Sequence, residues 1–292
     1  MIRKSAGRIV FESCNYLFLL LYLAVCILPF VHILAISFST RGPADANIVG
    51  LVPVDFTIEN YSRALQDRLL LMPFFNSIKR VILGVLCNMT ITVITAYSLS
   101  KENKKFPGRR IYTWFFIFSM FFSGGLIPMY LLILNMGLMG SIWALILPST
   151  VPIFNILVLL NFFRQLPGEI EEAAIIDGCS HFQILGRIFL PLSVPCLATL
   201  VLFCSIGHWN AWLDGLLYMR SSESYPLNTY LMVVITRLQS INTFADAQQM
   251  ENLSRRSMIM AYMIISIIPI AVVYPFLQKY IKSGLVLGSV KG

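Results

Sequence analysis

The stretch EEAAIIDGCSHFQILGRIFLPL, residues 171–192, lies between two long apolar runs of the chain. It opens with acidic residues, has a glycine near its middle and ends on a leucine, a proline and a leucine. Charged side chains are costly inside a bilayer, so a polar insert between apolar runs leaves the hydrocarbon. We therefore expect this insert to face water and to meet a protein partner.

The composition of the whole chain is typical of a membrane protein. Of its 292 residues, 57% are hydrophobic and only 12% are charged, and the mean hydropathy is +0.76. Soluble domains are about 25% charged. The net charge of +8 comes largely from basic residues at the ends of apolar runs, which retention on the cytoplasmic side explains better than nucleic-acid binding. The six cysteines show no disulfide framework and no CxxC metal pair.

Six apolar runs are long enough to cross about 30 Å of hydrocarbon at about 1.5 Å per residue. They lie near Tyr16–Ser37, Val81–Ser100, Ile111–Ile133, Ser141–Phe163, Phe189–Leu213 and Met258–Gln278. The first run exceeds the apolar region of a signal peptide, so we interpret it as a retained anchor. We expect an all-α polytopic membrane protein with six transmembrane helices. Its parts would be residues 1–73 (N-terminal segment, first span and external loop), 74–280 (five-helix core) and 281–292 (tail).

Basic residues predict how the chain crosses the membrane. They gather in MIRKSAGR, in KENKKFPGRR and at Lys279, Lys282 and Lys291. With six spans these segments share one side, which the positive-inside rule makes the cytoplasm, with both termini. Lys79 and Arg80 then lie at the outer end of the second span, against this trend. Two long external connections, Phe38–Arg80 and Asp214–Ser257, are either solvated loops or surfaces for a soluble partner.

The six predicted spans contain no Asp, Glu, Lys or Arg. His32 and His208 lie within them, and we interpret both as hydrogen-bonded structural residues. A proton-coupled or sodium-coupled carrier needs an ionisable group at membrane depth. The sequence therefore argues against self-powered transport, against an intramembrane metal site and against catalytic residues.

Neutral polar and aromatic side chains in or beside the spans mark a candidate solute pathway. We assign to it Tyr130, Asn155, Trp209, Asn210 and Asp214. Aromatic faces with neutral hydrogen-bonding groups suit a polyhydroxylated solute such as a sugar. Alternatively, the indoles form an interfacial aromatic belt and the amides join neighbouring helices.

The loop 164–188 is predicted to fold as helix, turn, helix. Pro167 suits the start of the first helix, acids complement its positive end, and Gly178 can end it in a left-handed conformation. Ser180 with Gln183 is typical of a capping box at the start of the second helix.

The first of these helices is expected to offer a small, smooth face to a partner. Its members recur at helical spacing: Ile170, Ala173, Ala174 and Asp177. Beyond the second helix, Pro191 and Pro195 are expected to bend or restart the chain at the membrane edge.

The same insert resembles the cytoplasmic-loop signature of importer-type ABC permeases. That signature reads E-A-A, three residues, G, nine residues, I, one residue, L-P. This chain matches it at Glu172, Ala173, Ala174, Gly178, Ile188, Leu190 and Pro191. Asp177 fits the version found in sugar importers. The resemblance implies that these eight residues couple the chain to an ATPase.

The resemblance extends over most of the chain. FSGGLIPMYLLILNMGLMGSIWALILP, GHWNAWLDGLLYM, YPLNTYLMVV and YPFLQKYIKSGLVLGSVKG look like the maltose-type permeases that handle oligosaccharides and polysaccharide fragments. It implies a type I ABC importer permease fold in the cytoplasmic membrane. It also implies a second permease subunit, two ATPase subunits, an external solute-binding protein near the second external loop, and an insert that serves as coupling helix.

The chain has no Walker A pattern G-x-x-x-x-G-K-[ST], so ATP and magnesium are expected on the partner ATPase subunits, with no cofactor on this chain. We expect a permease subunit, not an enzyme, that imports an oligosaccharide. The alternatives are another organic solute in the same architecture, or a secondary transporter.

Overall fold

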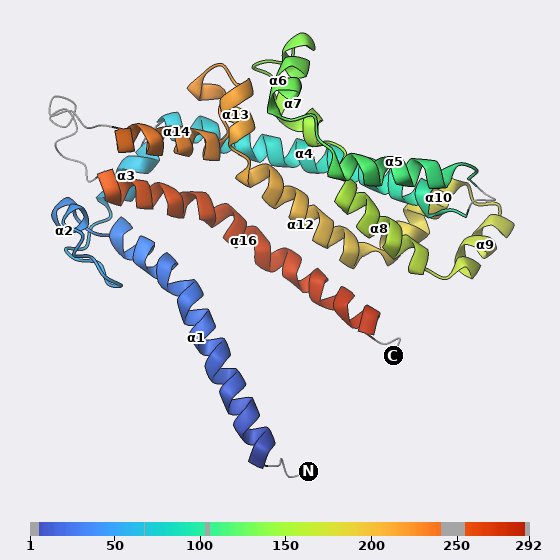
Figure 1. Cartoon of the computed structure of the whole chain (residues 1–292), viewed down its shortest axis with the longest axis horizontal. Helices are drawn as coiled ribbons and strands as arrows, with labels where there is room; N and C mark the ends of the chain where they lie inside the picture. Colours follow the sequence, from blue (N-terminus) through green and yellow to red (C-terminus); the bar gives the residue numbers. More distant parts are fainter. Residues whose placement is uncertain (1–5, 67, 103–105, 241–254, 290–292) are drawn as a thin grey trace. The chain divides into compact units, whose positions relative to one another are not determined.

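The computed structural model describes residues 6–66, 68–102, 106–240 and 255–289 (Figure 1). Helices make up the regular structure of these residues, beside one isolated antiparallel bridge between Ser39 and Phe56. The chain divides into two compact units. Unit 1 comprises Met1–Arg68 and Val233–Ile268, and unit 2 comprises Leu69–Met232 and Pro269–Gly292.

Unit 1 is built on one long apolar helix. Its own helices are α1 (Ala6–Ser37), α2 (Arg41–Asp45) and α3 (Glu59–Gln66). Most α1 side chains are exposed, as expected of a helix that faces lipid. The C-terminal end of α1 is pinned, because Asn60 Nδ2 donates to the Ser37 carbonyl at 2.9 Å and Ser37 Oγ lies 2.7 Å from Tyr61 Oη. His32 Nδ1 bonds to the Gly50 carbonyl at 2.8 Å, which confirms the structural interpretation of that histidine.

Unit 2 holds most of the remaining helices. In chain order they are α4 (Arg68–Ser100), α5 (Arg109–Phe121), α6 (Leu126–Asn135), α7 (Ile142–Ile146), η1 (Leu147–Ser149), α8 (Ile153–Gln165), α9 (Gly168–Ile176), α10 (His181–Ile184), η2 (Leu185–Phe189, a π-helix), α11 (Leu190–Leu192), α12 (Val194–Asn210), α13 (Leu213–Tyr218) and η3 (Ser222–Ser224). Both units share α14 (Leu227–Ser240) and α16 (Arg255–Ser289). In Figure 1, α8 and α12 lie alongside α4, and α9 and α10 lie at one end of α4.

The number of predicted apolar runs agrees with the number of candidate membrane spans in the structure. Within the described residues, α1, α4 and α16 contain continuous candidate spans. Three bent helix pairs raise the total to as many as six, if each pair is one span. The all-α, six-span prediction is thus confirmed in outline.

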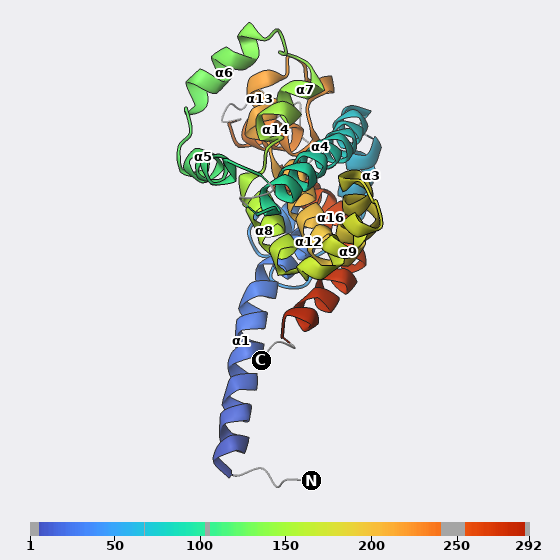
Figure 2. The ribbon, with the colours of Figure 1, turned by 90° about the vertical axis from the view of Figure 1, so that its right-hand side faces the viewer.

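Three of the predicted spans are bent, and the run Ser141–Phe163 is the least so, with 48° between its two helical parts. The run Ile111–Ile133 breaks between α5 and α6 at an angle of 111°, where Gly125 adopts a φ of +87°, so it is not one straight helix (Figure 2). The chain bends by 84° between α11 and α12, close to Pro191 and Pro195. That last bend confirms the effect expected of the two prolines.

The two long connections predicted outside the membrane are largely helical. The helix α4 begins at Arg68 and not at Val81, so it includes the end of the expected loop Phe38–Arg80 and the predicted domain boundary at residue 73. Within Asp214–Ser257 the structure contains α13, η3 and α14, while residues 241–254 lie outside the described part. Whether these connections meet a soluble partner stays a prediction. Residues 69–75, LLLMPFF, are apolar enough to extend the span.

Parts of the basic segments that predict orientation are not described, namely residues 1–5, 103–105 and 290–292. The cytoplasmic placement of both termini therefore stays a prediction. The segment expected as a tail, 281–292, continues α16 as far as Ser289.

The main core of unit 2 forms around aromatic rings beside the insert. Tyr97 of α4 meets Phe163 of α8 and Phe189 of η2 edge to face, with ring centroids 6.4 and 5.1 Å apart. Leu159 and Leu160 of α8 are completely buried beside them. This core fixes where the insert leaves the helix bundle.

Candidate functional site

The insert folds as a helix, a turn and a second helix, as predicted. The helix α9 follows Pro167, and the chain turns at Gly178 with a φ of +78°. Only glycine adopts this left-handed conformation without steric cost. Gln183 N donates to Ser180 Oγ at 3.4 Å and Ser180 N donates to Gln183 Oε1 at 2.8 Å, which confirms the capping box.

The residues of the loop signature point in two directions. Glu172, Ala173, Asp177, Gly178 and Pro191 are exposed. In contrast, Ala174 is buried in the unit 2 core, and Ile188 and Leu190 are half-buried and pack against it. The signature therefore combines an outward surface with the anchor that holds it.

The small face expected on α9 is incomplete. Ile170, Ala173 and Asp177 are exposed, but Ala174 is 6% exposed and belongs to the core. The prediction of an exposed face was wrong at Ala174, because α9 packs against the helix bundle on that side. Helical spacing identifies residues that share a side but does not say which side the bundle covers.

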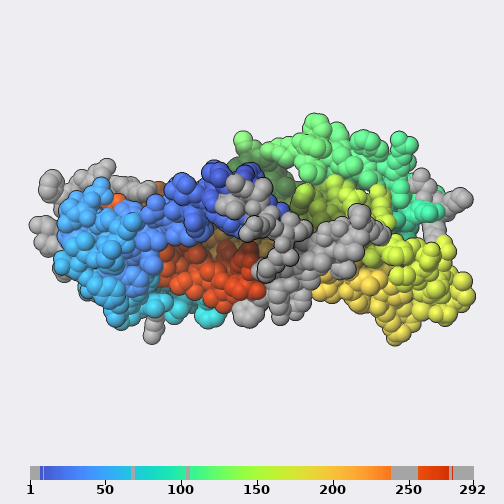
Figure 3. Space-filling view, turned by 90° about the horizontal axis from the view of Figure 1, so that it is seen from below, coloured from blue at the N-terminus to red at the C-terminus, as the bar shows by residue number. Residues whose placement is uncertain are grey.

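Two apolar side chains of the insert are far more exposed, and the sequence analysis missed them. Ile176 is 85% exposed and Phe182 is 84% exposed, one on each side of the Gly178 turn. The insert, yellow-green to yellow in Figure 3, lies at the surface. A signal existed, since both residues are large and apolar and lie in the short insert that is predicted to face water.

A second candidate site is a cavity of about 510 Å³ between α4, α7, α8 and α12. Its polar and aromatic lining residues are Arg80, Asn88, Ser149, Asn155, Phe203, His208, Asp214 and Tyr218. The other lining residues are Ala144, Leu145, Pro148, Val151, Pro152, Cys204, Gly207 and Ala211.

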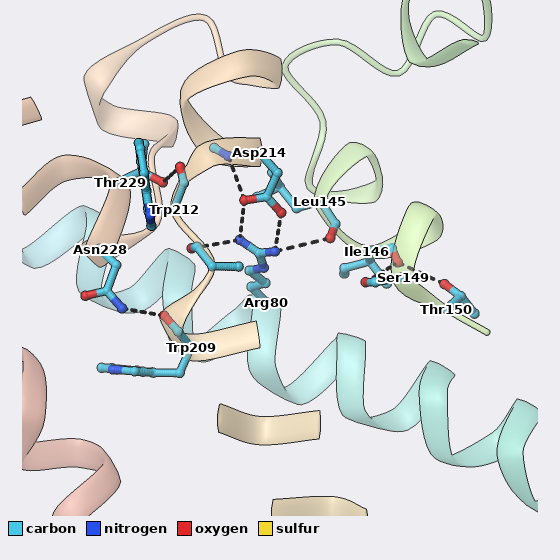
Figure 4. A network of polar contacts seen from close by, with 12 residues as sticks. Arg80, Leu145, Ile146, Ser149, Thr150, Trp209, Trp212, Asp214, Asn228 and Thr229 are labelled. Carbon is cyan, nitrogen blue, oxygen red and sulfur yellow. Dashed lines mark hydrogen bonds and ion pairs between the residues drawn. The ribbon is translucent and has the colours of Figure 1, made fainter. Parts of the chain in front are cut away.

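Arg80 joins three segments at this cavity (Figure 4). Its side chain is 2% exposed, and Nη1 donates to Asp214 Oδ1 at 3.1 Å while Nη2 contacts Asp214 Oδ2. Nη1 also donates to the Ala211 carbonyl at 3.3 Å, and Nη2 to the Leu145 carbonyl at 3.4 Å. A bidentate pair of this kind combines charge with fixed geometry. The guanidinium thus ties α4 to α7 and to the connection between α12 and α13.

Arg80 corrects the prediction that the spans carry no charge. The candidate span in α4 covers Leu70–Ser100 and contains both Lys79, which is exposed, and Arg80, which is buried. A buried arginine is tolerated in this span because a carboxylate and two carbonyls pair with it. Its position against the positive-inside trend was the signal that could have identified it.

Other buried polar groups of the lining keep hydrogen-bonding capacity. Asn155 Nδ2 and Asn88 Nδ2 donate to Cys204 Sγ at 3.1 and 3.7 Å. Within the described residues, His208 Nε2 and Asn88 Oδ1 are buried without a hydrogen-bond partner. Buried polar atoms normally have partners, so these two unsatisfied atoms distinguish the lining from an ordinary helix interface.

His208 packs closely on α4 at a position where that helix has a glycine. A Cβ at Gly84 would come within 2.4 Å of His208 Nε2. The imidazole therefore packs directly on the backbone of α4. The hydrogen bond expected from a purely structural histidine is absent at Nε2 among the described residues.

The structure brings together some of the predicted pathway residues. Asn155 and Asp214 line the cavity, and Tyr130 stacks on Tyr218, a lining residue, at a centroid distance of 6.3 Å. Burial, and then the charge of Asp214, raise the pKa of the Tyr218 phenol, which keeps it protonated as a donor.

Trp209 and Asn210 lie apart from the cavity lining. Trp209 is 5% exposed and meets Phe74 edge to face at 6.1 Å, and its carbonyl accepts from Asn228 Nδ2 at 2.6 Å. Asn210 is exposed. This arrangement is the one expected if Trp209 anchors the end of α12. Among the described residues, no group of three or more His, Cys, Asp or Glu side chains forms a candidate metal site.

Residues 88–286 match the family described as binding-protein-dependent transport system inner membrane component. The chain belongs to this family. Over all 292 residues, this permease is 40% identical to Protein LplC of Bacillus subtilis (strain 168), covering 98% of that protein. It is 34% identical to the polygalacturonan/rhamnogalacturonan transport system permease protein YtcP of the same strain, over 97% of this chain and 99% of that one.

A solved structure matches as well. A chain of a bacterial ABC transporter involved in the import of the acidic polysaccharide alginate superposes with a TM-score of 0.86. The two chains are 31% identical, and the match covers 96% of this permease and 99% of that chain. The predicted resemblance to sugar-importing ABC permeases and the type I fold are thereby confirmed.

Proposed function

We propose that this permease is the membrane subunit of an ATP-driven importer that carries an oligosaccharide across the cytoplasmic membrane. The observation that carries the proposal is its likeness, along nearly the whole chain, to permeases whose names state a polysaccharide cargo. The name of YtcP states polygalacturonan/rhamnogalacturonan transport. The solved transporter is described as involved in the import of the acidic polysaccharide alginate. Acidic oligosaccharides are therefore the first solutes to test, and neutral ones the second.

Partner subunits would supply energy and cargo. Two ATPase subunits would bind ATP and magnesium and dock on the insert 164–188, a second permease would complete the pathway, and an external binding protein would deliver the sugar. The exposed Ile176 and Phe182 support docking, since apolar side chains held out in water are typical of interaction surfaces. The exposed acids Glu172 and Asp177 beside them would give the docking surface charge specificity.

The cavity beside Arg80 would serve as a transient solute contact. Its volume of about 510 Å³ falls within the range of small-molecule sites. Asn155, Asn88 and His208 would exchange hydrogen bonds with sugar hydroxyls, and the Tyr218 ring would pack against a sugar face. Asp214 neutralises the Arg80 guanidinium, so the pair would not bind a sugar carboxylate tightly.

Reconstitution of the complete importer in proteoliposomes tests this function. Uptake of labelled oligogalacturonides, maltooligosaccharides and a peptide of similar mass would be measured with ATP inside the vesicles. We expect ATP-dependent uptake of at least one carbohydrate and none of the peptide. Uptake of the peptide alone, or uptake that persists without the ATPase subunits, would contradict the proposal.

Two variants of the complete importer test the pathway assignment. Asn155→Leu should lower uptake per assembled complex, because it removes a polar group from the lining at similar volume. Ser98→Ala, at an exposed position on α4 and outside the cavity, is the control. Equal uptake by both variants would remove the cavity from the pathway.

A further inference from the structure

One buried ion pair fastens the insert to the end of α4. Lys101, the residue after α4, places its Nζ 2.9 Å from Oε2 of Glu171 on α9. Their side chains are only 9% and 12% exposed. Two desolvated charges at this distance are costly to separate, because each would be left uncompensated in a poorly solvated site.

Aromatic rings enclose the ammonium group of this pair. Lys101 Nζ lies 3.7 Å from the centroid of the Tyr97 ring and 4.6 Å from that of Phe189. Both distances are within the range of cation–π attraction, which is strongest where water is excluded. Tyr97 belongs to α4 and Phe189 to η2, so the charge is held between three elements that include both sides of the insert.

A second contact joins α4 to the other half of the insert. Tyr97 Oη lies 3.2 Å from His181 Nδ1, on α10, beyond the Gly178 turn. The end of α4 is further capped by two arginines, since Arg109 Nη1 donates to the Lys101 carbonyl at 2.7 Å and Arg164 Nη2 to the Leu99 carbonyl at 3.2 Å. Cations are favourable at this end of a helix.

The other end of the same stretch of helix carries Arg80. From Arg80 to Lys101 the numbering advances by 21 residues without a proline, which corresponds to about 30 Å of helix. The ion pair and the cavity beside Arg80 are thus connected by one continuous helix. A displacement of the Lys101 end along the helix axis would reach the Arg80 end with little loss.

We propose that the Lys101–Glu171 pair positions the insert so that α9 and α4 move as one body, and that α4 transmits the displacement of the insert to the cavity. This inference rests on the proposed function, because it requires an ATPase to displace the insert. It assigns to Glu171, one residue before the matched loop signature, a role distinct from docking: Glu171 faces inward to Lys101, whereas Glu172 faces outward.

The first test compares two glutamate substitutions in the complete reconstituted importer. Glu171→Gln removes the charge that Lys101 binds, and Glu102→Gln makes the same change at an exposed position next to Lys101 and outside the insert. For Glu171→Gln we expect uptake per assembled complex to fall at least about tenfold. Loss of one partner of a buried ion pair shifts the equilibrium between the attached and the detached insert by more than about tenfold. ATPase co-purification and ATP hydrolysis should remain, so that more ATP is consumed for each sugar. Glu102→Gln should match the wild type.

Three outcomes would overturn the inference. Uptake per assembled complex could stay unchanged in Glu171→Gln, which would make the pair dispensable. The variant could lose its ATPase subunits, which would assign Glu171 to docking. It could also lose only abundance, which would make the pair purely structural. If instead the wild-type importer moved no carbohydrate while it hydrolysed ATP, the proposed function would fail separately.

A covalent bridge provides an independent test. Lys101→Cys and Glu171→Cys would be combined in a chain whose six native cysteines are replaced by serine or alanine, and the assembled importer would be treated with a short thiol cross-linker. We expect low uptake before cross-linking and recovery after it, because the bridge restores the connection. Continued loss of uptake after complete cross-linking would mean that α9 and α4 must separate during transport, which contradicts the inference.

Discussion

Arg80 and Asp214 are 134 residues apart in the chain and form a bidentate ion pair beside a polar cavity. Each residue supplies the opposite charge that makes the unusual position of the other favourable. Arg80 is a basic residue against the charge trend of the membrane topology, and Asp214 follows directly on an apolar span. Because the guanidinium also reaches the Leu145 and Ala211 carbonyls, the pair sets the relative positions of α4, α7 and α13.

Removal of Arg80 should destabilise the permease. We expect Arg80→Met to cost about 3 kcal/mol, the lower end for a broken buried ion pair, because Asp214 keeps some contact with water. The double variant Arg80→Met with Asp214→Leu should recover more than half of this loss. The neighbouring exposed Lys79→Met serves as control. Thermal unfolding in detergent measures all three, and equal effects at residues 79 and 80 would contradict the assignment.

A methyl group at Gly84 should be poorly tolerated. Gly84→Ala would place Cβ within 2.4 Å of the His208 imidazole, and overpacking of this kind costs about 1–3 kcal/mol. Adding His208→Ala to that variant should relieve the strain. Gly207→Ala is the matched control, since a Cβ there has open space. If Gly84→Ala and Gly207→Ala unfold at the same temperature, the close approach of His208 to α4 is disproved.

Trp209 and Asn210 should respond differently to truncation. Trp209→Ala should lower stability by about 3–5 kcal/mol because it leaves a cavity beside Phe74, whereas Asn210→Ala should have almost no effect on stability. Uptake per assembled complex and preference for oligosaccharide length decide between anchor and pathway. A change of preference in either variant at unchanged assembly would return these residues to the solute pathway.

The exposed apolar residues of the insert should matter for assembly and not for folding. Ile176→Asp and Phe182→Asp should each leave the unfolding temperature nearly unchanged, because surface substitutions stay within about 0.5 kcal/mol. Both should weaken co-purification of the ATPase, since a charge would then have to be desolvated at the contact. Glu169→Ala on the same insert is the control. Normal ATPase stoichiometry in both aspartate variants would exclude this surface from docking.

Labelling of introduced cysteines tests the orientation. In a chain without native cysteines, a membrane-impermeant reagent should modify a cysteine at Asn47 in intact cells, and a cysteine at Gln183 only after permeabilisation. Both positions are exposed in the structure, so burial does not prevent the reaction. Modification of the Gln183 site from outside would invert the topology and make cytoplasmic docking of the insert impossible.

Local signals in the sequence predicted the insert in detail. Pro167, Gly178 and the Ser180–Gln183 pair act through their own backbone and near neighbours, so their helix start, left-handed turn and capping box are found where they were expected. The apolar runs likewise predicted the spans, because span length is set by bilayer thickness and not by tertiary contacts. Even the bend near Pro191 and Pro195 follows from proline's missing N–H group.

Contacts between distant segments depended on the tertiary structure. The partners of Arg80 and Lys101 are 134 and 70 residues away, and no local pattern indicates which carboxylate approaches which cation. The inward turn of Ala174 and the close packing of His208 on Gly84 arise from how helices pack against one another. Helical periodicity shows which residues share a side of a helix, but only the packed bundle decides whether that side faces core, cavity, lipid or water.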